Sequence, residues 1–157
     1  LENQSGIASL TLIGSACEEL PKDEIQQRQQ LLKLIKNKRY AGMTEKRLKS
    51  FFHESHHQQN KYLSVVKQME QDLGAGVLSA QISATQSRKN LLPALAKCSF
   101  PIHIISGKQD NLWSESSVFA MHKQLANSDL TIVDNAGHML PIEQSKLLAE
   151  YLASKIE

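Results

Sequence analysis

The sequence predicts an α/β protein: a parallel sheet with three recognisable strands, flanked by helices and interrupted by an all-helical insertion. Three short apolar runs rich in β-branched residues predict the strands, at 8–14, 101–107 and 130–134. Near-continuous apolar strands separated by helical patterns are typical of a parallel sheet buried on both faces. The long segment 15–100 between the first two strands is charge-rich and contains no strand candidate, so it predicts an insertion made of helices.

Size and charge indicate an ordinary globular protein. The chain has 157 residues, of which 41% are hydrophobic and 22% charged, with a net charge of +2. That charge is too small to favour nucleic acid or an anionic membrane as a partner, and no apolar run reaches the about 18 residues of a membrane span. No secretory signal pattern is visible. Cys17 and Cys98 are far apart and lack a CxxC pattern, which favours a reducing cytoplasm with both thiols buried.

Helical patterns inside the insertion are local and follow recognisable start and stop residues. Thr44 is placed to cap one helix, and the "GAG" at 74–76 is expected to kink or interrupt another. A last short helix leads back to the second strand. The expected helices are 22–38, 44–57, 60–88 and 91–97.

The C-terminal part predicts two amphipathic helices. The first spans 114–128, with Ser114 as its N-cap, and its apolar face follows the helical spacing i, i+3, i+4, i+7. The last helix begins near Pro141, which suits a first helical position, and Glu143 lies in its first turn, where the helix dipole favours an acid.

Two polar residues follow consecutive predicted strands at the sheet's carboxyl edge. Asp110 comes shortly after the second strand, and His138 comes directly after the third. Neighbouring strands lie about 5 Å apart, so the two side chains can meet. A carboxylate bonded to histidine Nδ1–H fixes the tautomer and leaves Nε2 to accept a proton from a nucleophile. Each residue alone has a simpler interpretation: Asp110 as an Asx-turn residue and His138 as a solvated loop residue.

These segments resemble the α/β-hydrolase family. "LPALAKCSFPIHIISGKQDNLW" is similar to the family's segment that carries the triad acid, and "LTIVDNAGHMLPIEQSKLLAEYLASKI" is similar to its last strand, Gly–His turn and closing helix. In this family the residues of the catalytic triad occur along the chain in the order serine, then aspartate or glutamate, then histidine. The resemblance implies that Asp110 is the acid and His138 the base. It also implies a core strand segment at 1–16, a helical cap at 17–90 and a C-terminal core at 91–157.

The family's nucleophile motif, G-x-S-x-G, does not occur in this chain. Ser5, Ser15 and Ser106 all lack the required glycine spacing, so each is expected to be a turn or strand hydroxyl. We therefore expect a C-terminal fragment of a serine hydrolase acting on an ester, lactone or similar small carbonyl substrate, without a cofactor and inactive alone. A sheet edge left open would pair with the missing N-terminal half or with another copy of the chain.

Three residues near the acid and the base are candidates for substrate binding. Leu112 and Trp113 follow Asp110 and would either line a pocket or cap their loop, and Met139 follows His138.

Two other functions remain open at this stage. One is a non-catalytic binding protein on the same fold, with Asp110 and His138 as remnants. The other is a zinc metallopeptidase, because "HESHH" at 53–57 matches H-E-x-x-H. In a helix, His53 and His57 would share one face at the spacing that binds Zn²⁺, with Glu54 between them.

Overall fold

Three parallel strands form a single sheet in chain order. The computed structural model describes residues 4–156, so residues 1–3 of the expected segment 1–16 and residue 157 of the segment 91–157 lie outside the described residues. The strands β1 (Leu10–Ile13), β2 (Ile102–Gly107) and β3 (Ser128–Val133) pair side by side in the order β1-β2-β3. The predicted parallel sheet is confirmed.

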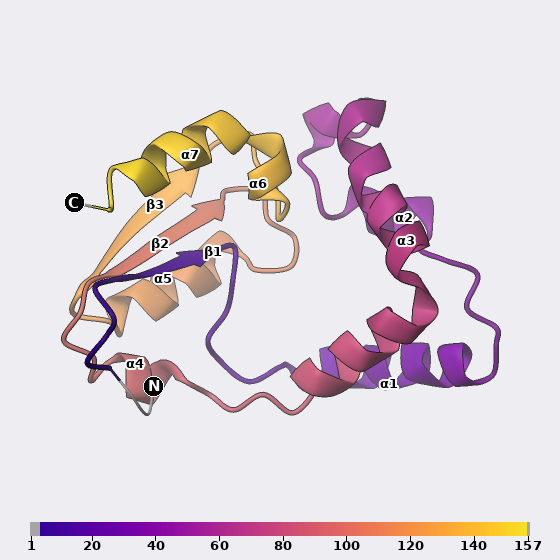
Figure 1. The fold of residues 1–157 in the computed structure, drawn as a ribbon, viewed down its shortest axis with the longest axis horizontal. Coiled ribbons are helices and arrows are strands. Elements are labelled where there is room, and N and C mark those ends of the chain that lie inside the picture. The colour runs from indigo at the N-terminus through magenta and orange to yellow at the C-terminus, as the bar shows by residue number, and fades with distance from the viewer. Residues whose placement is uncertain (1–3, 157) are drawn as a thin grey trace.

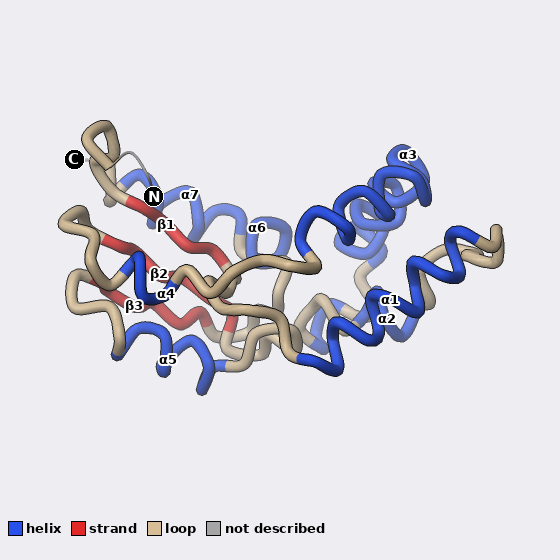
Figure 2. Tube along the Cα trace, turned by 90° about the horizontal axis from the view of Figure 1, so that it is seen from below, coloured by secondary structure: helices blue, strands red, loops and turns tan. Residues whose placement is uncertain are grey.

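Helices cover both faces of this sheet, as Figures 1 and 2 show. Helices α4 (Leu92–Leu95) and α5 (Glu115–Lys123) lie on one face, and α6 (Leu140–Glu143) and α7 (Ser145–Ala153) lie on the other. Strand side chains alternate between the faces, and β2 is buried along its whole length. The first core combines Ile102 and Ile104 with Val118 and Met121, and the second combines Ile105 with Leu140 and Leu148.

The helical part of the chain from α1 to α3, between β1 and α4, lies beyond the carboxyl ends of the strands (Figure 1). It contains α1 (Lys22–Lys36), α2 (Glu45–Lys49), the short 3-10 helix η1 (Glu54–His56) and α3 (Asn60–Thr85). Its own apolar core consists of Leu48, Phe52, Leu63 and Val66. Gly74 interrupts α3 with a φ of 69°, a backbone conformation that favours glycine, so the expected interruption at 74–76 is confirmed.

The single helix expected at 44–57 is wrong. Thr44 does cap α2, accepting the Arg47 N–H at 3.2 Å, but that helix ends at Lys49. The chain then turns inward: Phe52 is 1% exposed, and the Phe51 carbonyl accepts the Met139 N–H at 3.1 Å. Contact with a distant loop therefore overrides the local helical pattern.

Other predicted boundaries move for local reasons. The helix at 114–128 is shorter, because it ends at Lys123 and the Ser128 hydroxyl then donates to the Leu125 carbonyl at 2.7 Å. The last helix begins beside Pro141 as expected, but a non-helical Gln144 divides it into α6 and α7. Among the described residues, no helix combines the length and apolar character needed to cross a bilayer.

β3 begins two residues before the predicted run because a polar cluster supports its start. Asp129 lies opposite His103 in the β2–β3 register, and Asp129 Oδ2 is 2.6 Å from His103 Nδ1. Lys155 Nζ donates to the same oxygen at 3.0 Å, and the Tyr151 hydroxyl donates to Oδ1 at 3.2 Å. Burial and the adjacent Asp129 charge raise the pKa of Tyr151 to about 12. The cluster joins the first residues of β2 and β3 to the end of the chain.

The Asp129 pKa predicts a pH-dependent contribution to stability. Burial alone would raise this pKa, but hydrogen bonds from His103 and Lys155 outweigh burial and hold it below its ordinary value. Because the folded-state pKa lies below the unfolded-state value, the contribution is present above the unfolded value and is lost as pH falls through the folded value. We expect Asp129→Asn to lower the free energy of unfolding by roughly 0.5–1 kcal/mol at neutral pH, allowing for solvent screening of a half-exposed group, and by nothing near pH 2.

Urea denaturation at the two pH values measures this difference. Asp134→Asn is the matched control, since its ion pair with Lys108 involves two exposed side chains and should contribute little. Equal losses at both pH values for Asp129→Asn would contradict the prediction.

Candidate active site

The turn after β3 presents His138 at the carboxyl edge of the sheet. β3 ends at Val133, and Asn135 adopts a φ of 55°, a left-handed conformation that asparagine tolerates. The turn then passes under the neighbouring loop, where the Gln109 N–H donates to the Ala136 carbonyl at 3.0 Å. His138 follows with its side chain 32% exposed, so one side of the ring remains accessible.

Asp110 meets His138 directly. The Asp110 side chain is fully buried, and its Oδ2 lies 2.9 Å from His138 Nδ1. Its other oxygen, Oδ1, accepts the backbone N–H groups of Leu112 at 2.8 Å and Trp113 at 3.0 Å. The aspartate is therefore an Asx-turn residue and a histidine partner at once. With Nδ1–H donating to this carboxylate, Nε2 carries the lone pair that can accept a proton.

Close backbone packing brings the two loops together. Gly107 ends β2, and a Cβ there would lie 2.3 Å from the Gly137 carbonyl oxygen and 2.4 Å from the Ala136 carbonyl oxygen. Only glycine permits that approach. The end of β1 reaches the same place, since a Cβ at Gly14 would lie 3.7 Å from Asp110 Oδ2 and 3.8 Å from His138 Nδ1. All three strands thus end around the Asp110–His138 pair.

The three residues expected to bind substrate have structural contacts. Leu112 and Trp113 hold Asp110 through their backbone N–H groups, and the Trp113 ring packs against the core beneath α5. The Trp113 Nε1 is buried and has no hydrogen-bond partner among the described residues. Met139 packs against the insertion's core beside Phe52. Substrate binding by these side chains stays a prediction.

The expected helical placement of the zinc motif is wrong. His53 precedes η1 in an extended conformation, and its Nδ1 accepts the Ser55 N–H at 3.2 Å. The His57 ring instead faces the Phe52 carbonyl, with Nε2 at 3.1 Å. His53 and His57 thus have separate partners and do not share a helical face. Within residues 4–156 no group of three or more His, Cys, Asp or Glu side chains is arranged to hold a metal ion.

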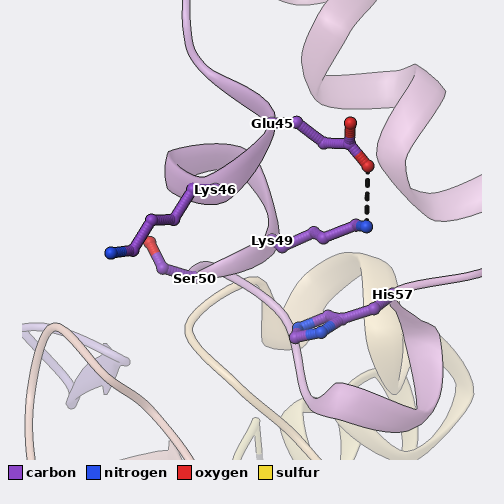
Figure 3. A pocket seen from close by; sticks show the side chains of 5 residues that line it. All are labelled: Glu45, Lys46, Lys49, Ser50 and His57. Atoms are coloured by element: carbon purple, nitrogen blue, oxygen red, sulfur yellow. Dashed lines mark ion pairs between the residues drawn. The ribbon is translucent and has the colours of Figure 1, made fainter.

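An open hollow of about 630 Å³ lies beside α2 (Figure 3), and neither Asp110 nor His138 lines it. Its lining residues are Glu45, Lys46, Lys49, Ser50 and His57. Lys49 points toward Glu45 and forms an ion pair with it at 2.6 Å, as Figure 3 shows. This i, i+4 pair lies on the surface, where such a pair contributes little to stability.

The sequence did not predict the position of Glu143 beside His138; it predicted only an acid in the first turn of a helix, favoured there by its charge. The structure buries this carboxylate against the turn that carries His138. Its only sequence signal is an acid on an otherwise apolar helical turn, five residues after the histidine.

Comparison with curated proteins shows a partial sequence likeness. The chain is similar to monoacylglycerol lipase ABHD6 of Bos taurus, 35% identical over 81 residues, which cover 49% of this chain and 24% of that protein. The Homo sapiens protein is 32% identical over the same length. The match spans about a quarter of these relatives. No family model matches the chain.

Solved structures show a likeness over nearly the whole chain. An esterase from Thermogutta terrifontis superimposes with a TM-score of 0.83 at 17% identity, over 96% of this chain and 57% of that one. The enol-lactonase from Burkholderia xenovorans LB400 gives 0.76 at 15% identity, over 96% and 56%. The chain therefore has the α/β-hydrolase fold. It spans somewhat more than half of these structures.

The close contact at Gly107 predicts a specific effect of a single methyl group. Gly107→Ala would drive the turn at residues 136–137 away from β2, and we expect it to lower the free energy of unfolding by about 1–3 kcal/mol. Gly76→Ala is the matched control, because a Cβ there meets nothing within 4 Å and the position is helical. That variant should be neutral or more stable by up to about 1 kcal/mol. Chemical denaturation of both variants measures the difference, and equal stabilities would contradict the packing argument.

Proposed function

We propose that this chain supplies the acid and the base of a serine hydrolase whose nucleophile lies in a preceding segment. The observation that carries the proposal is the contact between the buried Asp110 carboxylate and the partly exposed His138 ring at 2.9 Å. The lipase, esterase and lactonase named among the similar proteins support an ester, a lactone or a similar small carbonyl compound as the substrate. No cofactor is required for this chemistry.

In the proposed reaction His138 accepts a proton and then donates it, once while the acyl-enzyme forms and once while it is hydrolysed. Its Nε2 takes the proton of the serine hydroxyl as that oxygen bonds to the substrate carbonyl carbon. The imidazolium, stabilised by Asp110, then gives the proton to the leaving oxygen as the carbon–oxygen bond breaks. In the second half, a water molecule gives a proton to Nε2 as its oxygen attacks the acyl-enzyme. The imidazolium then returns that proton to the serine oxygen, and the carboxylic acid product leaves. The serine and the oxyanion donors belong to the preceding segment.

The remaining parts of the chain take supporting roles in this proposal. Segments 1–16 and 91–157 form the core, and segment 17–90 acts as a cap that excludes water and shapes the substrate pocket beside Leu112, Trp113 and Met139. β1 has one neighbour, β2, among the described strands, so its other edge is the natural place for the preceding segment of the same protein or for another copy. Cys17 and Cys98 are buried free thiols, which agrees with a cytoplasmic location.

The catalytic pair predicts which variants lose activity. In the full-length protein, Asp110→Asn should lower the rate constant for hydrolysis of an activated ester by about 10³–10⁴-fold, because the histidine loses its correct tautomer. His138→Ala should abolish labelling by a fluorophosphonate probe.

Asp129→Asn provides the matched control, since it disrupts a second His–Asp pair at the opposite end of the same strands. Its activity should stay within about twofold of the parent. Retained activity in Asp110→Asn, or labelling independent of His138, would contradict the roles proposed for this pair, whereas a full-length parent protein with neither activity nor labelling would favour the non-catalytic binding protein.

The same proposal predicts that residues 1–157, expressed without any preceding segment, are inactive. This chain should show no ester hydrolysis above background and no fluorophosphonate labelling, because Ser106 is 1% exposed and G-x-S-x-G is absent. Stoichiometric labelling of a serine within the chain would place the nucleophile here and overturn this part of the proposal.

A further inference from the structure

Glu143, the last residue of α6, has a fully buried side chain. Burying an ionised carboxylate is costly unless hydrogen-bond donors replace the lost water. An acid whose only task is to stabilise a helix end would remain in solvent, where that cost does not arise. The burial of Glu143 therefore requires a different explanation.

Both oxygens of Glu143 have donors, and the donors come from two distant parts of the chain. Oε1 accepts the His53 backbone N–H at 2.6 Å and lies 3.0 Å from His56 Nδ1. Oε2 accepts the backbone N–H of Gly137 at 2.8 Å. One carboxylate thus joins the helical insertion to the residue immediately before His138.

The backbone of the insertion lies directly on the same turn. A Cβ at Gly137 would lie 2.8 Å from the Phe51 carbonyl oxygen and 2.9 Å from the His53 nitrogen. On the other side of His138, the Met139 N–H donates to the Phe51 carbonyl at 3.1 Å. The neighbours of His138 on both sides are therefore bound to residues 51–53 or to Glu143.

We propose that Glu143 is a positioning residue that makes the orientation of His138 depend on docking of segment 51–56. This inference rests on the proposed function, because it assigns a consequence for the reactivity of His138. The insertion then does more than cover the site: it holds the turn from which the His138 ring reaches Asp110. Release of segment 51–56 leaves the fold in place and lowers the rate of proton transfer.

The arrangement requires a carboxylate in particular. Two oxygens serve three N–H donors, whereas a glutamine offers one oxygen and turns an NH₂ group toward a donor. Glu143→Gln therefore leaves either the Gly137 side or the His53 side unpaired. Glu143→Asp keeps the charge but is one methylene shorter, so it cannot reach both sides. His56→Ala removes one donor and leaves the other two.

The test measures the second-order rate constant for fluorophosphonate labelling of the full-length protein and its variants. Each rate constant is measured under conditions in which circular dichroism shows the variant to be fully folded, so that a loss of stability alone does not change it. We expect Glu143→Gln and Glu143→Asp to label about 10–100-fold more slowly, the effect of a small misplacement of a catalytic group, and His56→Ala to show a smaller loss. Deuterium uptake at residues 50–57 should rise in the same variants.

Glu150→Gln is the matched control, because Glu150 is an exposed acid on α7 whose ion pair with Lys146 is 4.0 Å long. It should label at the parental rate. Parental rate constants for Glu143→Gln, Glu143→Asp and His56→Ala would overturn the positioning role and leave the proposed function intact. If Glu143→Gln does not fold, the rate constants of Glu143→Asp and His56→Ala test the positioning role. If the parent protein is not labelled, or is labelled without His138, the proposed function fails first and the inference fails with it.

Discussion

The arrangement of this site depends on one close contact between two strand ends. Gly107 lets the carbonyl groups of Ala136 and Gly137 approach the end of β2 more closely than any side chain would allow. That approach places the loop after β2 directly beside the turn after β3, so that Asp110 Oδ2 lies 2.9 Å from His138 Nδ1. The parallel pairing of β2 with β3 supplies the direction, because it places both loops at the same edge.

A second His–Asp pair in the same two strands shows why position matters more than composition. His103 and Asp129 lie near the starts of β2 and β3. Asp129 also accepts hydrogen bonds from Lys155 and Tyr151, so both of its oxygens are used within the fold. The Asp110–His138 pair lies instead at the carboxyl edge, with a partly exposed ring. The same two residue types form a pair held within the fold at one end of the sheet and a pair with a partly exposed imidazole at the other.

The insertion and the sheet are joined at this edge through polar contacts of the backbone. Glu143 uses both carboxylate oxygens to join segment 51–56 to the His138 turn, and the Met139 N–H adds a further bond to Phe51. Buried polar contacts of this kind are directional, so they specify how two parts meet more sharply than apolar packing does. The likeness to esterase and lactonase structures concerns the fold.

The sequence by itself determined the fold class, the three strands, the interruption at Gly74, the caps Thr44 and Ser114, and the pairing of Asp110 with His138. These features follow from local patterns: apolar runs, glycine and cap residues, and the rule that parallel strands share one carboxyl edge. Only the tertiary structure decided that the helix begun at Thr44 stops at Lys49, that His53 and His57 face different partners, and that Glu143 is buried. The end of that helix and the burial of Glu143 depend on contact between segment 51–56 and residues 137–143. Residues so far apart in the chain leave no periodic pattern in the sequence, so their contact becomes visible only once the sheet and the insertion have come together.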